Sequence, residues 1–252
     1  MTDLTVLIPV RIDSVVRLEN IIAVVKYLIS SFDAHVIVIE ADKYNNHILK
    51  AVLPKKVFCY FVDDCDPVFY RTRLINDFAR NVTSRYIAIW DADVVVPAVQ
   101  VQKSLEMLRQ GVCDIVYPYD GTFLDTSEII RQIYIEANDI GILQELQGMM
   151  CAPYGTKMRG GAFIANTDIY RAAGMENERF YGWGPEDWER VERWKNLGYR
   201  IKTVDGVLFH LSHPRDMNGM HNNPEQKRYT FKEKSIIMYS SAEEIKARMG
   251  LE

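Results

Sequence analysis

The sequence has no long apolar run and no region typical of an export signal. Its best candidate for a membrane span, residues 21–29, is short and contains Lys26, whereas a spanning helix needs about 20 apolar residues. The first residues, Met1-Thr2-Asp3-Leu4, lack the basic and then apolar regions of a signal peptide. We therefore expect a cytoplasmic protein without a transmembrane segment.

Closely spaced cysteines and an excess of positive charge are also missing. The four cysteines, at positions 59, 65, 113 and 151, show no Cys-x-x-Cys spacing, which indicates neither a zinc site nor a disulfide framework. The 34 acidic residues outnumber the 30 lysines and arginines, and the net charge is −4. A protein that binds nucleic acid by neutralising phosphates normally carries a basic surplus, so we expect no nucleic-acid partner.

The first half of the sequence alternates short apolar runs with segments whose apolar residues recur at helical spacing. The runs cover residues 4–10, 35–40, 57–62, 86–90 and 113–117. Runs of this length and composition are typical of strands that are buried on both faces. Their alternation with helices predicts an α/β fold with a Rossmann-like, mostly parallel sheet flanked by helices.

Polar residues follow four of these apolar runs directly. In parallel sheets, ligands bind at the carboxyl ends of the strands. The residues at these ends are Arg11, Asp13, Glu40, Asp42, Asp63, Asp64, Asp91 and Asp93. Four such strand ends predict a cleft rich in carboxylates.

The second half is less regular. Residues 125–146 have the periodicity of a helix, residues 160–165 have the pattern of a turn that enters a strand, and residues 204–211 form a last apolar run. Glu186 opens a further helix that Gly198 ends. We find no internal repeat or linker, and we expect one domain over residues 1–252.

Asp91-Ala92-Asp93 follows an apolar run, so its two acidic side chains are expected to emerge together at the edge of the sheet. Two close carboxylates repel each other unless a cation lies beside them. A divalent metal that holds a diphosphate is a natural occupant, because Mg²⁺ and Mn²⁺ prefer oxygen ligands. The alternative is a chance Asp-x-Asp that caps the helix expected after Pro97.

His210 and His213 lie three residues apart after the last apolar run. Neutral imidazole is a common metal ligand, and at the end of a strand the two rings can converge on one ion. Taken alone, such a pair is more often two hydrogen-bonded or surface histidines. Together with Asp93, the pair predicts a metal site.

The segment Gly182-Trp183-Gly184-Pro185-Glu186-Asp187 places two carboxylates at the start of a helix. The helix dipole favours their ionised form, and an ionised carboxylate in a cleft can accept a proton from a hydroxyl group. Trp183 offers a flat apolar face for a sugar ring. The alternative is an acid-capped helix with a core tryptophan.

These motifs occur in an order that resembles the inverting GT-A glycosyltransferases. The resemblance is strongest to the beta-1,4-galactosyltransferase-like and chondroitin-polymerase-like branch of the family 2-type glycosyltransferases. The motifs are Ile8-Pro9-Val10-Arg11, the segment 69–76, Asp91-Ala92-Asp93, Gly160-Gly161-Ala162-Phe163, the segment 182–187 and His210-x-x-His213. The resemblance implies the GT-A fold, with a nucleotide-sugar-binding half (1–111), a smaller acceptor-binding and catalytic half (112–225) and a helical tail (226–252).

The resemblance also implies roles for individual residues. Asp187 would be the general base, and its neighbour Glu186 would bind the acceptor together with Trp183 and Tyr181. The donor would be bound by Pro9, Arg11, Asp13, Glu40, Asp63, Arg71, Asp91, Asp93 and Gly161. Asp93 and His213 would hold a divalent metal, with Mn²⁺ favoured and Mg²⁺ possible. His210, where the animal enzymes have methionine, would be a further ligand.

The activity implied is metal-dependent transfer of a hexose or N-acetylhexosamine, with a galactose-type sugar favoured, from a UDP-sugar to a glycan or lipid-linked glycan. The resemblance and the missing anchor together suggest a bacterial, cytoplasmic version. Two alternatives are an iron oxygenase with two histidines and one carboxylate, and a non-catalytic carbohydrate-binding domain of the same fold. The basic residues after Pro224 form either a solvated helix face or a peripheral membrane contact.

Overall fold

Two β-sheets form the centre of the molecule in the computed structural model, which describes residues 2–155, 157–214 and 219–251. The larger sheet has seven strands in the order β3-β2-β1-β4-β8-β6-β9. These strands are β1 (Leu4–Val10), β2 (His35–Asp42), β3 (Phe58–Asp63), β4 (Tyr86–Trp90), β6 (Ile115–Tyr117), β8 (Ala162–Asn166) and β9 (Ile201–Thr203). The smaller sheet has the order β5-β10-β7 and consists of β5 (Val94–Val95), β7 (Phe123–Asp125) and β10 (Leu208–His210).

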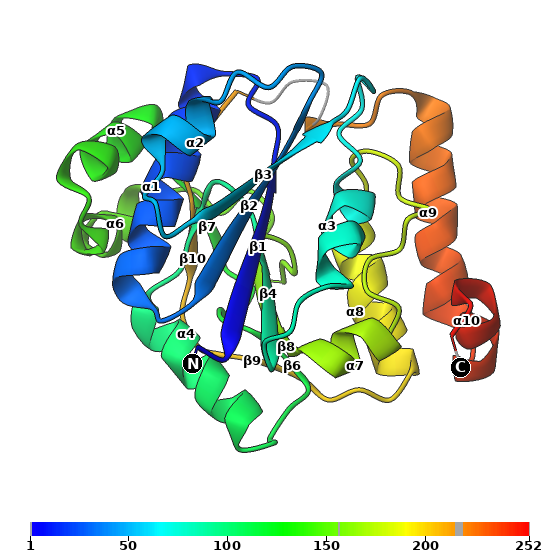
Figure 1. Cartoon of the computed structure of the whole chain (residues 1–252). Helices are drawn as coiled ribbons and strands as arrows, with labels where there is room; N and C mark the ends of the chain where they lie inside the picture. Colours follow the sequence, from blue (N-terminus) through cyan, green and yellow to red (C-terminus); the bar gives the residue numbers. More distant parts are fainter. Residues whose placement is uncertain (1, 156, 215–218, 252) are drawn as a thin grey trace.

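Helices cover both faces of the large sheet (Figure 1). One side carries α1 (Val15–Ser31), α4 (Ala98–Arg109), α5 (Glu128–Ala137) and α6 (Ile140–Glu145). The other side carries α3 (Arg71–Ala79), α7 (Thr167–Ala172), α8 (Glu186–Asn196), α9 (Pro224–Tyr239) and α10 (Ala242–Met249). The short α2 (Ile48–Val52) precedes β3, and a 3₁₀ turn (Gln147–Met149) follows α6. Among the described residues, no helix is both long and apolar enough to span a membrane.

The first four strands of the large sheet along the chain are parallel to their neighbours among them, as the sequence predicts. β1 is buried along its whole length and lies between β2 and β4, parallel to both. The register aligns Val10 with Glu40 and Asp42 with Asp63. The polar ends of these strands therefore lie along one edge of the sheet.

The strand next to β4 differs from the simple alternation of strands and helices. β8 enters between β4 and β6 and runs antiparallel to both, with Phe163 opposite Ile89 and Ile164 opposite Val116. Because β8 is short and almost entirely apolar, it can be buried between two strands. The chain leaves the sheet after β6 and returns through the segment that ends at Gly161.

Two further segments differ from the sequence-based expectation. The segment 125–146, expected as one helix, begins with the end of β7 at Asp125 and then forms two helices, because Asn138 takes a left-handed conformation (φ 51°) and Asp139 caps α6. Residues 204–211 do not form one strand. Gly206, with φ 122°, lies in the turn between β9, which stays in the large sheet, and β10, which belongs to the small one.

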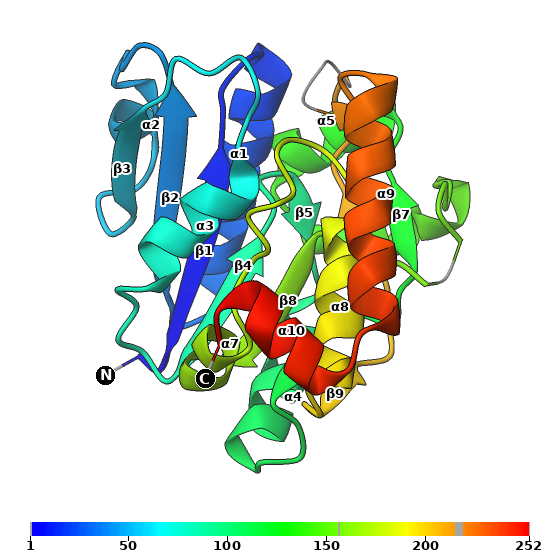
Figure 2. The same ribbon diagram turned by 90° about the vertical axis from the view of Figure 1, so that its right-hand side faces the viewer.

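The C-terminal part forms two helices rather than one. Asn223 caps α9, and Ser241 starts α10 with a capping box. α9 lies along α8, as Figure 2 shows, and buries Thr230, Glu233 and Ile237. The segment expected as a helical tail is therefore a second helical layer outside α8.

An aromatic cluster fixes α8 to the large sheet. Trp194 of α8 lies edge-on to Phe163 of β8, with ring centres 5.2 Å apart, and Tyr170 packs beside both. All three side chains are buried. Burying one side chain of the size of phenylalanine stabilises the fold by about 1.5–3 kcal/mol. This cluster therefore anchors the last turn of α8, and with it the whole helix, to the sheet.

Candidate active site

The small sheet brings together three segments that are distant in the sequence. β5 begins directly after Asp91-Ala92-Asp93 and pairs with β10, whose other neighbour is β7. The register places His210 opposite Val94 on one side and opposite Asp125 on the other. The amide of Leu211 donates to the carbonyl oxygen of Asp93 at 2.8 Å. These backbone contacts bring the acid after β4 next to the histidines after β10.

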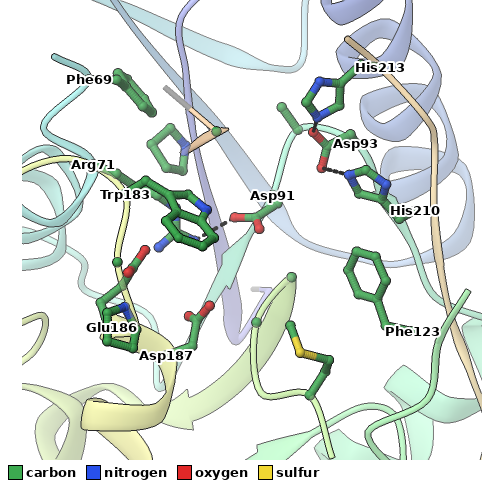
Figure 3. A pocket seen from close by; sticks show the side chains of 18 of the residues that line it. Phe69, Arg71, Asp91, Asp93, Phe123, Trp183, Glu186, Asp187, His210 and His213 are labelled. Atoms are coloured by element: carbon green, nitrogen blue, oxygen red, sulfur yellow. Dashed lines mark hydrogen bonds and ion pairs between the residues drawn. The ribbon is translucent and has the colours of Figure 1, made fainter. Parts of the chain in front are cut away.

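Asp93, His210 and His213 form a compact triad at one side of the pocket (Figure 3). Asp93 Oδ2 lies 3.1 Å from His213 Nε2, and Asp93 Oδ1 lies 3.6 Å from His210 Nε2. One nitrogen or oxygen atom of each residue lies within 4.8 Å of the others. This donor set can surround one divalent cation.

Charged neighbours keep the carboxylate of the triad ionised. Burial alone would raise the pKa of Asp93, but His210, His213 and Arg17 outweigh burial and hold that pKa below its usual value. Burial would lower the pKa of His213, but its hydrogen bond to Asp93 and the charge of that carboxylate raise it. Arg17 of α1, whose Nη1 lies 3.7 Å from Asp93 Oδ2, is a neighbour that the sequence analysis missed.

Asp125 orients one of the two histidines. Its Oδ1 lies 2.8 Å from His210 Nδ1, which leaves Nε2 directed at Asp93. The ring of Phe123 packs on the same imidazole, with ring centres 4.9 Å apart. Carboxylates in this position fix the tautomer and the orientation of metal-binding histidines. In sequence Asp125 is only the start of a helical pattern, and nothing local indicates its partner 85 residues away.

The two acids of Asp91-Ala92-Asp93 have different surroundings. Arg71, the first residue of α3, donates from Nη2 to Asp91 Oδ1 at 2.6 Å, whereas Asp93 belongs to the triad. The amide of Asp91 donates to the carbonyl oxygen of Gly161 at 2.8 Å. The pattern led us to expect both carboxylates beside one cation. Instead, each has its own partners.

A second acidic centre lies at the start of α8. Arg190 donates from Nη2 to Asp187 Oδ1 and from Nη1 to Glu176 Oε2, both at 2.7 Å. Its side chain is almost completely buried, and its guanidinium carbon lies 4.4 Å from the ring centre of Phe163. Arg190 therefore fixes the carboxylate of Asp187 against the core. The sequence analysis missed it, because an arginine inside a charged helix looks like a surface residue.

The surroundings of Glu186 favour its protonated form. Burial, reinforced by the negative charge of Asp187, raises the pKa of Glu186 to about 8, although Arg71 opposes the shift. Its Oε2 is shielded from solvent and has no hydrogen-bond partner among the described residues. At pH 7 Glu186 is therefore mostly protonated and can donate a hydrogen bond.

Gly160 and Gly161 allow close backbone packing beside this centre, and Gly160 lies against Asp187. A Cβ atom on Gly160 would lie 2.5 Å from Asp187 Oδ2, and the hydroxyl of Tyr119 donates to the Gly160 carbonyl oxygen at 2.6 Å. Gly161 has φ 84°, and a Cβ there would lie 2.8 Å from Leu208. Any side chain at position 160 would displace the Asp187 carboxylate or the loop itself.

The two acidic centres line one cavity of about 380 Å³, which is in the range of small-molecule sites. Figure 3 shows the triad on one side, Glu186 and Asp187 on the other, and Asp91 between them in this view. The predicted residues that line the cavity are Pro9, Arg11, Asp13, Arg71, Asp91, Asp93, Gly161, Trp183, Glu186, Asp187, His210 and His213.

Three predicted site residues do not line this cavity. Glu40 and Asp63 lie further along the same sheet edge, at the ends of β2 and β3. Tyr181 turns away, because its hydroxyl donates to Asp66 and its ring packs edge-on against Tyr70, with ring centres 5.2 Å apart. Tyr181 is therefore not a wall of this cavity.

Trp183 stands at the mouth of the cavity, and α9 supports its loop. The indole is 39% exposed and available to a ligand. Gln226 of α9 donates from Nε2 to the carbonyl oxygens of Tyr181 and Trp183, at 2.8 and 3.2 Å. His221 lies edge-on to the indole, with ring centres 4.7 Å apart. The sequence analysis missed both supports: it assigned Gln226 to the helical tail, and it placed His221 in the acceptor-binding half without linking it to Trp183.

Comparison with known proteins finds glycosyltransferases, first in a match to a protein-family model. Residues 148–217 match a family model described as the N-terminal domain of galactosyltransferase. The matched region includes Gly160, Asp187 and His213. No curated protein sequence is significantly similar to this chain.

Solved structures with a similar arrangement of elements include two glycosyltransferases. The catalytic domain of Drosophila β1,4-galactosyltransferase 7, in complex with xylobiose, has a TM-score of 0.57 and 15% identity, over 90% of this chain and 80% of that one. Glucosyl-3-phosphoglycerate synthase from Mycobacterium tuberculosis, in complex with Mn²⁺, UDP and phosphoglyceric acid, has a TM-score of 0.52 and 12% identity, over 99% and 79%. The chain has the GT-A fold. In this GT-A fold the seven-stranded, mostly parallel sheet lies between helices, as the resemblance implied.

Proposed function

We propose that this protein is a metal-dependent glycosyltransferase that transfers a sugar from a UDP-sugar to a glycan acceptor. The proposal rests on one observation: a buried Asp-His-His triad and an arginine-held carboxylate line the same cavity of a GT-A fold. Structures with this fold include complexes with Mn²⁺ and UDP, and a mutant of Drosophila β1,4-galactosyltransferase 7 in complex with manganese, UDP-Gal and xylobiose.

Asp93, His210 and His213 are the proposed metal ligands. They fit a divalent ion because their donor atoms converge and because Asp93 is held ionised. Imidazole ligands suit Mn²⁺ better than Mg²⁺, which prefers oxygen. When bound, such a metal neutralises the charge that develops on the departing diphosphate.

The donor would lie along the carboxyl ends of β1 to β4. Arg71 and Arg11 are the cations of this region, with Asp91, Asp13, Pro9 and Gly161 beside them in the cavity. Glu40 and Asp63 lie further out on the same edge, where the nucleoside of a bound donor would extend. A hexose or N-acetylhexosamine of the galactose type is the favoured sugar.

Asp187 is the proposed general base. It accepts the proton of the acceptor hydroxyl as that oxygen attacks the anomeric carbon from the face opposite the diphosphate. One displacement of this kind converts an α-linked donor into a β-glycoside. Arg190 and Gly160 hold the Asp187 carboxylate in place, Glu186 donates a hydrogen bond to the acceptor, and Trp183 covers its ring.

The test is UDP release from a panel of nucleotide sugars with Mn²⁺, Mg²⁺ or EDTA. We expect UDP release from at least one UDP-hexose or UDP-N-acetylhexosamine, faster with Mn²⁺ than with Mg²⁺ and abolished by EDTA. Asp93→Asn should abolish it, whereas Asp168→Asn, a control at a side chain that is 93% exposed, should not.

Other outcomes of this screen would contradict the proposal. UDP release that persists in EDTA would refute the metal site. Glycan binding without any turnover would favour a carbohydrate-binding domain. Turnover of a 2-oxoacid with Fe²⁺ would favour an oxygenase that uses the same triad.

A further inference from the structure

The cavity wall beyond Trp183 is built by α9 and the segment before it. His221 and Phe231 line the cavity together with Trp183 and Trp188. The rings follow one another, with centres 4.7 Å apart for Trp183 and His221 and 5.9 Å apart for His221 and Phe231. Phe231 is 47% exposed. The wall is therefore an aromatic surface that continues from Trp183 onto α9.

Two lysines flank Phe231 on the same face of α9. Lys227, Phe231 and Lys234 have the spacing i, i+4 and i+7, which aligns them along one side of a helix. The ammonium nitrogen of Lys234 lies 5.6 Å from the ring centre of Trp188, which lines the cavity. Lys227 is near enough to His221 to lower the pKa of that imidazole, in addition to the effect of burial. Both positive charges therefore lie beside the cavity wall.

These lysines have no acidic partner in the part of the chain that the structure describes. No ion pair joins Lys227 or Lys234 to a carboxylate of residues 2–155, 157–214 or 219–251. Glu233, on the neighbouring face of α9, is buried and bound to Arg248 and Arg179. The acids of the cavity have their own cations, Arg71 for Asp91 and Arg190 for Asp187. The lysine charges are therefore free for a ligand, in a chain whose net charge is −4.

One further polar group on this wall lacks a partner. Nδ1 of His221 is shielded from solvent and makes no hydrogen bond within the described residues. Buried polar atoms of folded proteins are normally hydrogen-bonded. This nitrogen therefore has no partner within the described part of the chain, and the residue that carries it lines the cavity.

We propose that His221, Lys227, Phe231 and Lys234, here called the α9 strip, form a subsite for an anionic group of the acceptor glycan. The inference rests on the proposed function and extends it to the class of acceptor. Trp183 and Phe231 cover the apolar faces of successive sugars, and the two ammonium groups pair with a carboxylate or phosphate on the sugar next to the accepting one. Because Phe231 lines the cavity itself, the strip fits a bound acceptor better than a lipid surface.

The test compares disaccharide acceptors that differ only in charge. They share the non-reducing sugar that the enzyme accepts, chosen from N-acetylglucosamine, glucose and xylose, and carry glucose, glucuronate or glucose 6-phosphate as the second residue. We expect kcat/KM for one anionic acceptor to exceed that for the neutral one by about 5- to 30-fold. Two partly exposed ion pairs contribute binding free energy that corresponds to a ratio of this size. The ratio should fall as salt is raised, and which anion gives the larger ratio distinguishes carboxylate from phosphate.

Charge-reversal variants test whether the preference for anionic acceptors depends on the lysines of the α9 strip. Lys227→Glu with Lys234→Glu should bring the ratio of anionic to neutral kcat/KM close to 1. Lys232→Glu changes the same charge on the outward side of the same helix and should keep the parent ratio. Circular dichroism of each variant checks that the helix is intact.

The remaining outcomes distinguish failure of the anionic subsite from failure of the proposed function. A ratio of 1 in the parent, with transfer to the neutral acceptor intact, refutes the subsite and leaves the proposed function standing. Absence of metal-dependent UDP release refutes the function itself. If Lys232→Glu lowers the ratio as much as the double variant, overall charge rather than the strip is responsible. If the ratio is 1 and the double variant instead abolishes sedimentation with phosphatidylglycerol vesicles, the strip is a lipid contact and the inference is wrong.

Discussion

The two acidic centres of the cavity have similar carboxylates but different counter-groups. Asp93 faces two imidazoles, each of which can present a nitrogen lone pair to a metal. Asp187 faces the guanidinium of Arg190, which has donors only and cannot be a ligand. The first centre is therefore suited to a cation, and the second keeps its carboxylate for proton transfer. The different roles proposed for Asp93 and Asp187 therefore follow from the side chains that face them.

The fold also builds the two centres differently. The triad needs three segments that meet only through the small sheet, at β5, β7 and β10. In the second centre, Glu186, Asp187 and Arg190 all lie on α8, whose last turn carries Trp194 into the aromatic cluster. Changes in one centre should therefore leave the other in place, and separate substitutions can test the division of roles.

The largest effect is expected at the second centre. Asp187→Asn keeps the shape of the side chain and an oxygen for Arg190 but removes the base. We expect transfer to fall by about 10²- to 10⁴-fold, while the affinity for UDP with Mn²⁺ stays within about twofold. Steady-state transfer assays and calorimetric UDP titrations measure the two quantities. Transfer at the parent rate would remove Asp187 from the mechanism.

A smaller effect is expected behind the triad. Asp125→Ala removes the acceptor that orients His210. We expect the affinity for Mn²⁺ in the presence of UDP to fall about 10- to 100-fold. In Asp125→Asn this affinity should fall less, because the amide oxygen still accepts a hydrogen bond. The exposed Asp205→Ala is the control. An unchanged Mn²⁺ titration in a folded Asp125→Ala protein would contradict this role.

The smallest effect concerns stability and pH. The unfolded chain ionises Glu186 near its usual pKa of 4.5, whereas in the folded protein this pKa is about 8. Between these values the folded state binds the extra proton, so the free energy of unfolding falls as the pH rises. Glu186→Gln removes this loss, so its stability relative to the parent should increase progressively from pH 5 to pH 8.5.

Thermal and urea unfolding across this pH range measure the difference between the two curves. Glu145 is exposed, and the free energy of unfolding of the control variant Glu145→Gln should change with pH as that of the parent does. If the stability of Glu186→Gln also changes with pH as that of the parent does, the carboxyl of Glu186 is ionised in the folded protein, and the assignment of a protonated Glu186 is wrong.

Local patterns were enough to predict much of the fold. β1 and β4 are continuous apolar runs, and their ends in the structure match those expected from the sequence. Because the carboxyl ends of parallel strands share one edge, the position of Arg11, Asp91 and Asp93 near a common cavity followed from the order of elements, whereas Arg71 was predicted from the resemblance. The position of Asp187 required the resemblance, since an acid at the start of a helix is by itself an ordinary cap.

What the sequence could not predict depends on pairing between distant segments. β8 shows the pattern of a strand, but no local feature places it antiparallel between β4 and β6. The same holds for β10, which leaves the large sheet for the small one. Asp125 acquires a role only through this pairing. Tyr181 was misplaced for a related reason, because an aromatic beside a motif can pack inward or turn to a partner such as Asp66.

The insertion of β8 also has a consequence for how the chain folds. β1 to β4 are complete once about the first third of the chain has been made, yet one side of β4 has no partner until β8 follows much later. Pairing across such a separation is slow, because the entropy of closing the loop is lost before the contacts form. Until then, Tyr86–Trp90 is a bare apolar strand edge, the kind of surface through which unfinished chains aggregate. The centre of the finished sheet is thus the most vulnerable part of the nascent protein.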